Sequence, residues 1–120
     1  MAGLEASILR QSDMLSGDGF GQLAGLGPAE LDRRRLAREV LAFEVGPDCI
    51  RAPMWQVAAD RSLLPGLPRL FELLGDDPWA VYLFLTTPHP DFGWGAPLES
   101  LRRGITAPVL AAAEGLEPNK

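Results

Sequence analysis

The chain has 120 residues, of which 47% are hydrophobic and 22% charged, and its formal net charge is −5. This composition is typical of a folded protein and excludes disorder across the whole chain. The acidic balance argues against a surface broadly coated by nucleic acid, and neither half of the chain is basic.

The chain contains one cysteine, Cys49, and one histidine, His89. A single cysteine cannot form an internal disulfide, and the two residues supply too few ligands for a typical zinc site. We therefore expect no metal and no cofactor. No apolar run approaches the roughly 18 residues that a membrane helix needs. The N-terminus lacks the basic start and apolar core of a signal peptide, so we expect a cytoplasmic protein without membrane contact.

Residues 1–15 show weak amphipathicity, and we expect a flexible arm or a loosely docked helix there. Apolar residues then recur at near-helical spacing from Phe20 to Leu26, where glycines break the run. Pro28 suits the first turn of a second helix, because its missing N–H would be unpaired there in any case. With this helix running to about Arg38, the order of helix, glycine turn and helix predicts a unit similar to a helix-turn-helix.

Two short apolar stretches, at residues 40–45 and 49–51, flank a Gly-Pro-Asp turn and predict a β-hairpin. A short turn should follow it. The next segment, residues 60–68, is rich in loop-forming residues and predicts a junction. We therefore divide the chain into an arm (1–15), a helix-turn-helix-like part with a β-hairpin (16–61) and a compact helical C-terminal domain (62–120).

Short helices are predicted beyond the junction. One covers residues 69–74 and ends at Gly75, and another covers residues 97–103 and ends at Gly104. Thr106 should cap a last helix that runs to about residue 114. The predicted fold class is therefore mainly α, with one small β-hairpin.

The helix predicted over residues 79–85 is almost entirely apolar and should lie in the core. Asp76 or Asp77 would cap it, with Pro78 in its first turn. A buried strand over residues 80–85 is the competing interpretation, because periodicity does not separate the two. The Asp-Asp-Pro start favours the helix.

Four arginines cluster on and after the predicted second helix and are the candidate DNA-binding residues: Arg33, Arg34, Arg35 and Arg38. Three consecutive helical residues fan through about 200°, so they cannot all face one phosphate backbone. Glu30 and Glu39 lie four residues from Arg34 and Arg35, which favours a solvated, salt-bridged face. The alternative is a recognition helix with Arg34 and Arg38 on one face.

Most aromatic residues should lie in the core, because each buries a large area. We expect only Trp94, and with it Trp55, near the surface. Prolines and aromatic residues are concentrated in residues 84–104, FLTTPHPDFGWGAPLESLRRG. One interpretation of this loop is purely structural: the prolines end a helix and stiffen a turn, and Phe92 and Trp94 fill the core from the loop side. The functional interpretation adds a partner surface around the loop, with Trp94 exposed.

This stretch resembles the C-terminal toxin-binding domain of Xre/MbcA/ParS-type antitoxins. The shared pattern is, in order, an apolar pair, Thr-Pro, a polar residue, Pro, an apolar residue, Gly, Pro-Leu, a short helix and Gly. The resemblance covers about residues 67–115. The family commonly has Asn at the position of His89. It often begins the following helix with Thr-Pro, where this chain has Ala96-Pro97.

This resemblance implies an antitoxin that binds and neutralises a cognate RES-type, NAD-consuming toxin by occluding its active site. It also implies autorepression of the operon, with operator DNA as a further candidate partner and a homodimer as the expected assembly. The candidate toxin-binding residues are Thr87, Pro88, His89, Trp94, Leu116, Glu117, Asn119 and Lys120. The last four belong to the tail, which otherwise is simply a frayed end.

Enzyme signatures are missing from the sequence: there is no catalytic triad around the single histidine and no phosphate-binding glycine loop. We therefore expect a protein that is not an enzyme and has no catalytic residue. Two alternatives to the antitoxin remain. One is a stand-alone DNA-binding transcriptional regulator, and the other is an accessory protein-binding module without a toxin.

Overall fold

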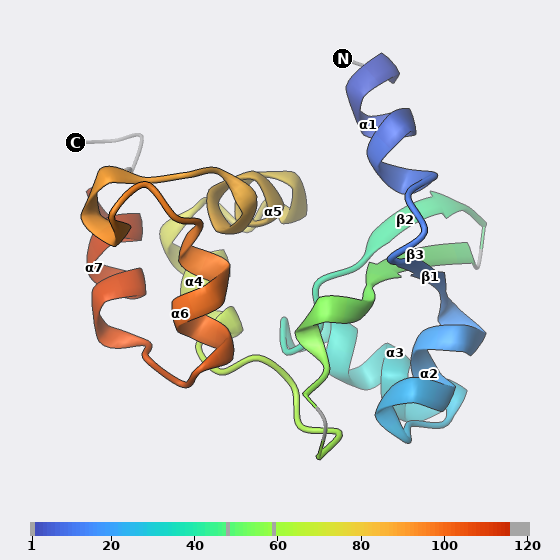
Figure 1. The fold of residues 1–120 in the computed structure, drawn as a ribbon. Coiled ribbons are helices and arrows are strands. Elements are labelled where there is room, and N and C mark those ends of the chain that lie inside the picture. Colours follow the sequence, from blue (N-terminus) through green and yellow to red (C-terminus); the bar gives the residue numbers. More distant parts are fainter. Residues whose placement is uncertain (1, 48, 59, 116–120) are drawn as a thin grey trace.

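The computed structural model describes residues 2–47, 49–58 and 60–115. Within them helices dominate, and a small antiparallel sheet lies on the side of α1–α3, with α4–α7 grouped on the other side (Figure 1). The first half contains α1 (Ala2–Leu9), β1 (Met14–Ser16), α2 (Gly17–Ala24), α3 (Pro28–Leu36), β2 (Phe43–Gly46), β3 (Cys49–Pro53) and a 3-10 turn (Met54–Gln56).

The second half of the described chain is helical. It contains α4 (Leu67–Leu73), α5 (Pro78–Thr86), a 3-10 turn (Pro90–Phe92), α6 (Pro97–Arg102) and α7 (Ala107–Glu114). The mainly helical fold with a β-hairpin is therefore confirmed. No helix among the described residues combines the length and the apolar character that crossing a bilayer requires.

The sheet has the order β1-β3-β2, with both pairs antiparallel. Strands β2 and β3 form the predicted hairpin, with a bulge between Glu44 and Gly46. Strand β1 was not predicted, because three residues are too short to show an alternating pattern. It pairs Met14 with Pro53 and buries the Met14 side chain, so residues predicted as an arm supply α1 and an edge of the sheet.

Helices α2 and α3 are joined by a tight glycine turn. The Ser16 hydroxyl accepts a hydrogen bond from Gly19 N–H at 3.1 Å and caps α2. Leu26 N–H donates to the Gly21 carbonyl oxygen at 2.8 Å, which closes the turn. A Cβ on Gly21 would lie 2.7 Å from the Leu26 carbonyl oxygen, so only glycine fits this turn.

Helix α3 ends at Leu36, two residues earlier than predicted. Arg38 has φ 64° and occupies the left-handed position at which helices commonly end in glycine. Arg38 N–H donates to the Arg35 carbonyl, and Glu39 N–H donates to the Arg34 carbonyl at 2.9 Å. These bonds form a Schellman motif, so Arg38 lies outside the helix to which the sequence assigned it.

Helix α5 forms as predicted, and the competing strand does not. Asp77 Oδ1 accepts a hydrogen bond from Trp79 N–H at 3.0 Å, and Pro78 lies in the first turn. Leu83, however, is 44% exposed, so one face of this apolar helix meets solvent. The predicted cap of α7 does not form, because Thr106 has helical backbone angles and its hydroxyl accepts no capping bond.

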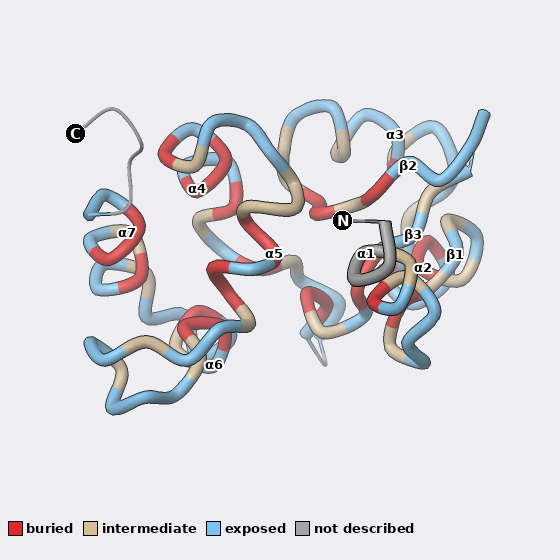
Figure 2. The backbone as a smooth tube through the Cα atoms, turned by 90° about the horizontal axis from the view of Figure 1, so that it is seen from above, coloured by how far each residue is buried: buried red, intermediate tan, exposed pale blue. Residues whose placement is uncertain are grey.

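Two clusters form the core, seen as the red segments in Figure 2. The smaller lies between α2, α3 and the sheet, and includes Phe20, Leu31 and Val40. The larger joins residues from before and after the predicted junction, including Leu41 and Leu85. The division of the chain at residue 62 stays a prediction.

Gln56 is the one buried polar residue among those described, at 1% exposure. Its side-chain amide accepts from Leu41 N–H at 2.8 Å and donates to the carbonyl oxygens of Leu41 at 2.7 Å and Pro53 at 3.1 Å. Buried polar groups need such partners because they have lost water. The Gln56 side chain thus links the segment before the hairpin to the segment after it through hydrogen bonds.

Candidate functional site

The loop between α5 and α6, residues 87–95, is held by bonds within its own backbone. His89 N–H donates to the Gly95 carbonyl oxygen at 3.1 Å. The His89 carbonyl accepts from Phe92 N–H at 3.0 Å and from Trp94 N–H at 3.1 Å. Both ends of the loop therefore close on one residue, between two prolines that have no N–H to donate.

The His89 side chain packs the loop against α5. Its ring lies edge-on to Phe84 and to Phe92, with centroids 6.5 and 5.8 Å apart. Its Nδ1 accepts a hydrogen bond from Asp91 N–H at 3.1 Å. Phe92 is partly buried against the larger core cluster, as predicted. His89 therefore serves first to shape this loop.

Trp94 lies at the surface, as expected, and does not fill the core: it is 68% exposed, the largest exposure among the large hydrophobic residues described. Its φ is 67°, directly after Gly93 at 62°. The left-handed conformation costs a residue with a Cβ roughly 1–2 kcal/mol, and it persists only where surrounding contacts impose it. The loop thus holds an exposed indole ring in a strained conformation, which fits an anchor for a partner protein.

The other candidate toxin-binding residues fall in two groups. Thr87 and Pro88 are exposed and start the loop, and Thr87 N–H donates to the Leu83 carbonyl at 3.0 Å. The structure brings them together with His89 and Trp94. The tail residues lie outside the described residues: Leu116, Glu117, Asn119 and Lys120.

The four candidate DNA-binding arginines are all paired with carboxylates. Arg33 and Arg34 both bind Glu30, and Arg34 also binds Glu39 at 2.9 Å. The pKa of Glu30 is lowered by its hydrogen bonds, first with Arg33 and then with Arg34. The predicted salt-bridged face is thus present, although Glu39 pairs with Arg34 instead of Arg35 because the chain turns after Leu36.

The remaining two arginines tie α3 to other elements. Arg35 binds Asp32 at 2.6 Å and Glu44 of β2 at 3.1 Å. Arg38 binds both carboxylate oxygens of Asp76, at 2.7 and 2.8 Å. Arg34 and Arg38 therefore do not share a face of one helix, because α3 ends at Leu36, and DNA binding by the four arginines stays a prediction.

Asp76 is a partner that the sequence interpretation missed. Asp76 and Asp77 were alternative caps for α5, and Asp77 takes that role. Asp76 instead has φ 61° and faces Arg38, whose guanidinium also lies 5.4 Å from the centre of the Phe71 ring. The only sequence signal was a second aspartate next to the capping aspartate. That signal does not predict an ion pair with an arginine 38 residues away.

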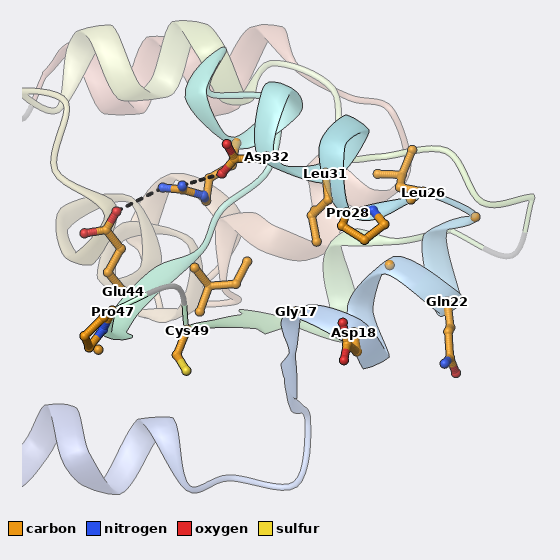
Figure 3. A pocket seen from close by; sticks show the side chains of 16 residues that line it. Gly17, Asp18, Gln22, Leu26, Pro28, Leu31, Asp32, Glu44, Pro47 and Cys49 are labelled. Atoms are coloured by element: carbon orange, nitrogen blue, oxygen red, sulfur yellow. Dashed lines mark hydrogen bonds and ion pairs between the residues drawn. The ribbon is translucent and has the colours of Figure 1, made fainter.

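A groove of about 790 Å³ lies between α2, α3 and the hairpin (Figure 3). Its wall includes Leu31 and Ile50, and the dashed lines in the figure mark the ion pairs that end on Asp32 and Glu44. With Asp18 also present, acids outnumber bases in the lining. The groove next to the helix-turn-helix-like unit is thus not a surface that attracts phosphate.

Comparison with known proteins supports the C-terminal resemblance. Residues 69–107 match the model of a family described as the antitoxin Xre/MbcA/ParS C-terminal toxin-binding domain, and this confirms the resemblance in that segment. None of the curated proteins matches the chain in sequence. The matched segment contains the whole of the loop at residues 87–95.

The fold as a whole is similar to the NMR structure of Rv2175c. The TM-score is 0.71 at 16% sequence identity, and the match covers 89% of this chain and 84% of that one. At this identity the likeness shows the fold alone. It does show that the arrangement reaches well beyond the segment that the family model matches.

Proposed function

We propose that this protein is an antitoxin whose C-terminal helices bind a toxin protein and block it without doing chemistry themselves. The observation that carries the proposal is that the segment matching the toxin-binding family presents an exposed, strained Trp94. Aromatic anchors surrounded by ordered backbone are typical of protein-binding hot spots. The toxin partner is part of this proposal.

The finer features come from the family resemblance. The toxin would be of the RES type and consume NAD, and the tail at residues 116–120 would enter its cleft. Blocking the active site of a toxin requires a surface of fixed shape and no catalytic group. A loop held by its own backbone hydrogen bonds provides such a surface.

Repression of the operon is not part of the proposal. The four candidate arginines are paired with acids, and the groove beside them is acidic. A stand-alone DNA-binding regulator is therefore the weaker function.

Co-expression with the product of the neighbouring gene tests the proposal. A stable complex should form and relieve growth inhibition, and Trp94→Ala should weaken binding by at least tenfold, as loss of a hot-spot residue does. Leu36→Ala is the matched control, because Leu36 is 63% exposed but lies at the end of α3, away from the loop (Figure 1). A harmless neighbour that forms no complex would contradict the proposed function.

A further inference from the structure

A second groove, of about 790 Å³, lies between the segment after the hairpin and the C-terminal end of α6. Its apolar wall comes from Trp55, Leu63, Leu64 and Pro65, and Arg102 and Arg103 form its opposite side. Its volume falls within the range of about 300–1,000 Å³ that is usual for binding clefts. None of these residues takes part in the site described above.

The apolar wall is pre-formed by backbone hydrogen bonds. Ala58 N–H donates to the Ser62 carbonyl oxygen at 2.8 Å, and Leu64 N–H donates to the Gln56 carbonyl oxygen at 3.0 Å. Gln56 is itself fixed by its three buried side-chain bonds. A partner would therefore lose little free energy in ordering this wall.

Two arginines give one side of this groove a local positive charge, although the chain as a whole is acidic. Arg102 and Arg103 are exposed and form no ion pair with any described residue, whereas the four arginines on and after α3 are all paired. The one acid in the lining, Asp60, already accepts bonds from Ser62 N–H at 3.0 Å and Ser62 Oγ at 2.6 Å. In a chain of net charge −5, two adjacent guanidinium groups beside an apolar wall favour an acidic partner.

We propose that this groove binds an acidic, apolar segment of the same toxin that Trp94 anchors, an inference that rests on the proposed function. The loop at residues 87–95 enters α6, and Arg102 ends it, so the two regions lie at opposite ends of one helix (Figure 1). The six residues of α6 span about 9 Å, and a standard protein interface of roughly 800 Å² per partner is wide enough to cover both ends of such a helix. The apolar wall favours a protein segment over nucleic acid.

The purified toxin complex tests this inference through its association rate at several salt concentrations. R102E/R103E should lower the rate at low salt by about tenfold and remove most of its salt dependence, because rim charges act mainly on association. R102Q/R103Q should have a smaller effect in the same direction. The control is R10E/R51E, which changes the net charge equally at two exposed arginines that have no described ion pair.

The outcomes separate the two proposals. If Trp94→Ala weakens the complex while R102E/R103E behaves like its control, the inference is wrong and the proposed function stands. Absence of any complex with the unaltered chain overturns both. Two further measurements test other occupants of the groove. If light scattering shows that the free chain self-associates and that R102E/R103E does not, the occupant is a second copy of the chain. If the unaltered chain binds DNA in a titration and R102E/R103E does not, the occupant is nucleic acid, and either result overturns the inference.

Discussion

Single residues decide what this molecule displays and what it hides. Trp94 and Gln56 are opposite cases. Trp94 is an exposed apolar ring on a strained backbone, whereas Gln56 is a buried amide that both accepts and donates hydrogen bonds. The loop around Trp94 does not relieve this strain, because Trp94 N–H donates to the His89 carbonyl oxygen and the neighbouring Gly95 carbonyl oxygen accepts from His89 N–H, each at 3.1 Å. Strain of this kind, at an exposed ring, supports the proposal that Trp94 is an anchor for a partner protein.

Trp94→Gly should be more stable than Trp94→Ala by about 1 kcal/mol, because glycine adopts the left-handed conformation without a Cβ penalty. Both variants should lose toxin binding, since both lack the indole ring. Urea unfolding measures the difference in stability. Equal stability of the two variants would show that the backbone at Trp94 carries no strain.

Gln56→Met should lower the free energy of unfolding by about 2–4 kcal/mol, because it leaves the Leu41 N–H and carbonyl buried without partners. Gln22→Met on the exposed face of α2 is the control and should stay within about 0.5 kcal/mol of the unaltered protein. Thermal and urea unfolding followed by circular dichroism give both values. If Gln56→Met lowered the free energy of unfolding no more than Gln22→Met does, the hydrogen bonds of Gln56 would not stabilise the fold.

Some ion pairs in this fold join residues of different secondary-structure elements. Arg38 follows α3 and Asp76 follows α4, and both have left-handed backbone conformations. Hydrogen bonding with Asp76 raises the pKa of Arg38. The pair connects the end of α3 to the turn after α4.

A double-mutant cycle on Arg38→Ala and Asp76→Ala should give a coupling energy of about 0.5–1 kcal/mol, at the upper end for exposed pairs because the contact is bidentate. The coupling should fall with added salt. Arg69 and Glu72, exposed on α4 and joined at 2.9 Å, are the matched control and should couple by only a few tenths of a kcal/mol. Equal couplings would mean that the longer-range pair has no special role.

At the scale of the whole molecule, the larger of the two core clusters contains residues from both halves of the chain. The larger cluster runs from Ile8 and Met14 to the last described helix. The stability of the C-terminal helices should therefore depend on the N-terminal segment as well. The acid network on α3 makes the stability of the molecule depend on pH.

Stability should fall at acid pH partly through Glu30. Its folded pKa lies below its ordinary value of 4.5, so it stabilises the fold above that value, and this contribution is lost as pH falls through the lower folded pKa. Glu30→Gln should therefore destabilise the protein at pH 7 more than it does under acid conditions. Urea unfolding over this pH range measures the effect, and a penalty that is independent of pH would contradict it.

Local sequence signals determined most of the helices, because proline in a first turn and glycine after a last turn act within a few residues. Pro28, Pro78 and Pro97 all start helices where expected, and the motif at residues 84–104 indicated the toxin-binding family that the comparison confirms. The candidate loop was therefore accessible from the sequence.

Only the tertiary structure decided how distant residues meet. The pairing of β1 with β3, the ion pair between Arg38 and Asp76, and the groove beside Arg102 each join segments far apart in the chain. The exposure of Trp94 depends on the whole loop closing on His89. Such contacts follow from packing across the molecule, whereas helix starts and ends follow from the backbone chemistry of neighbouring residues.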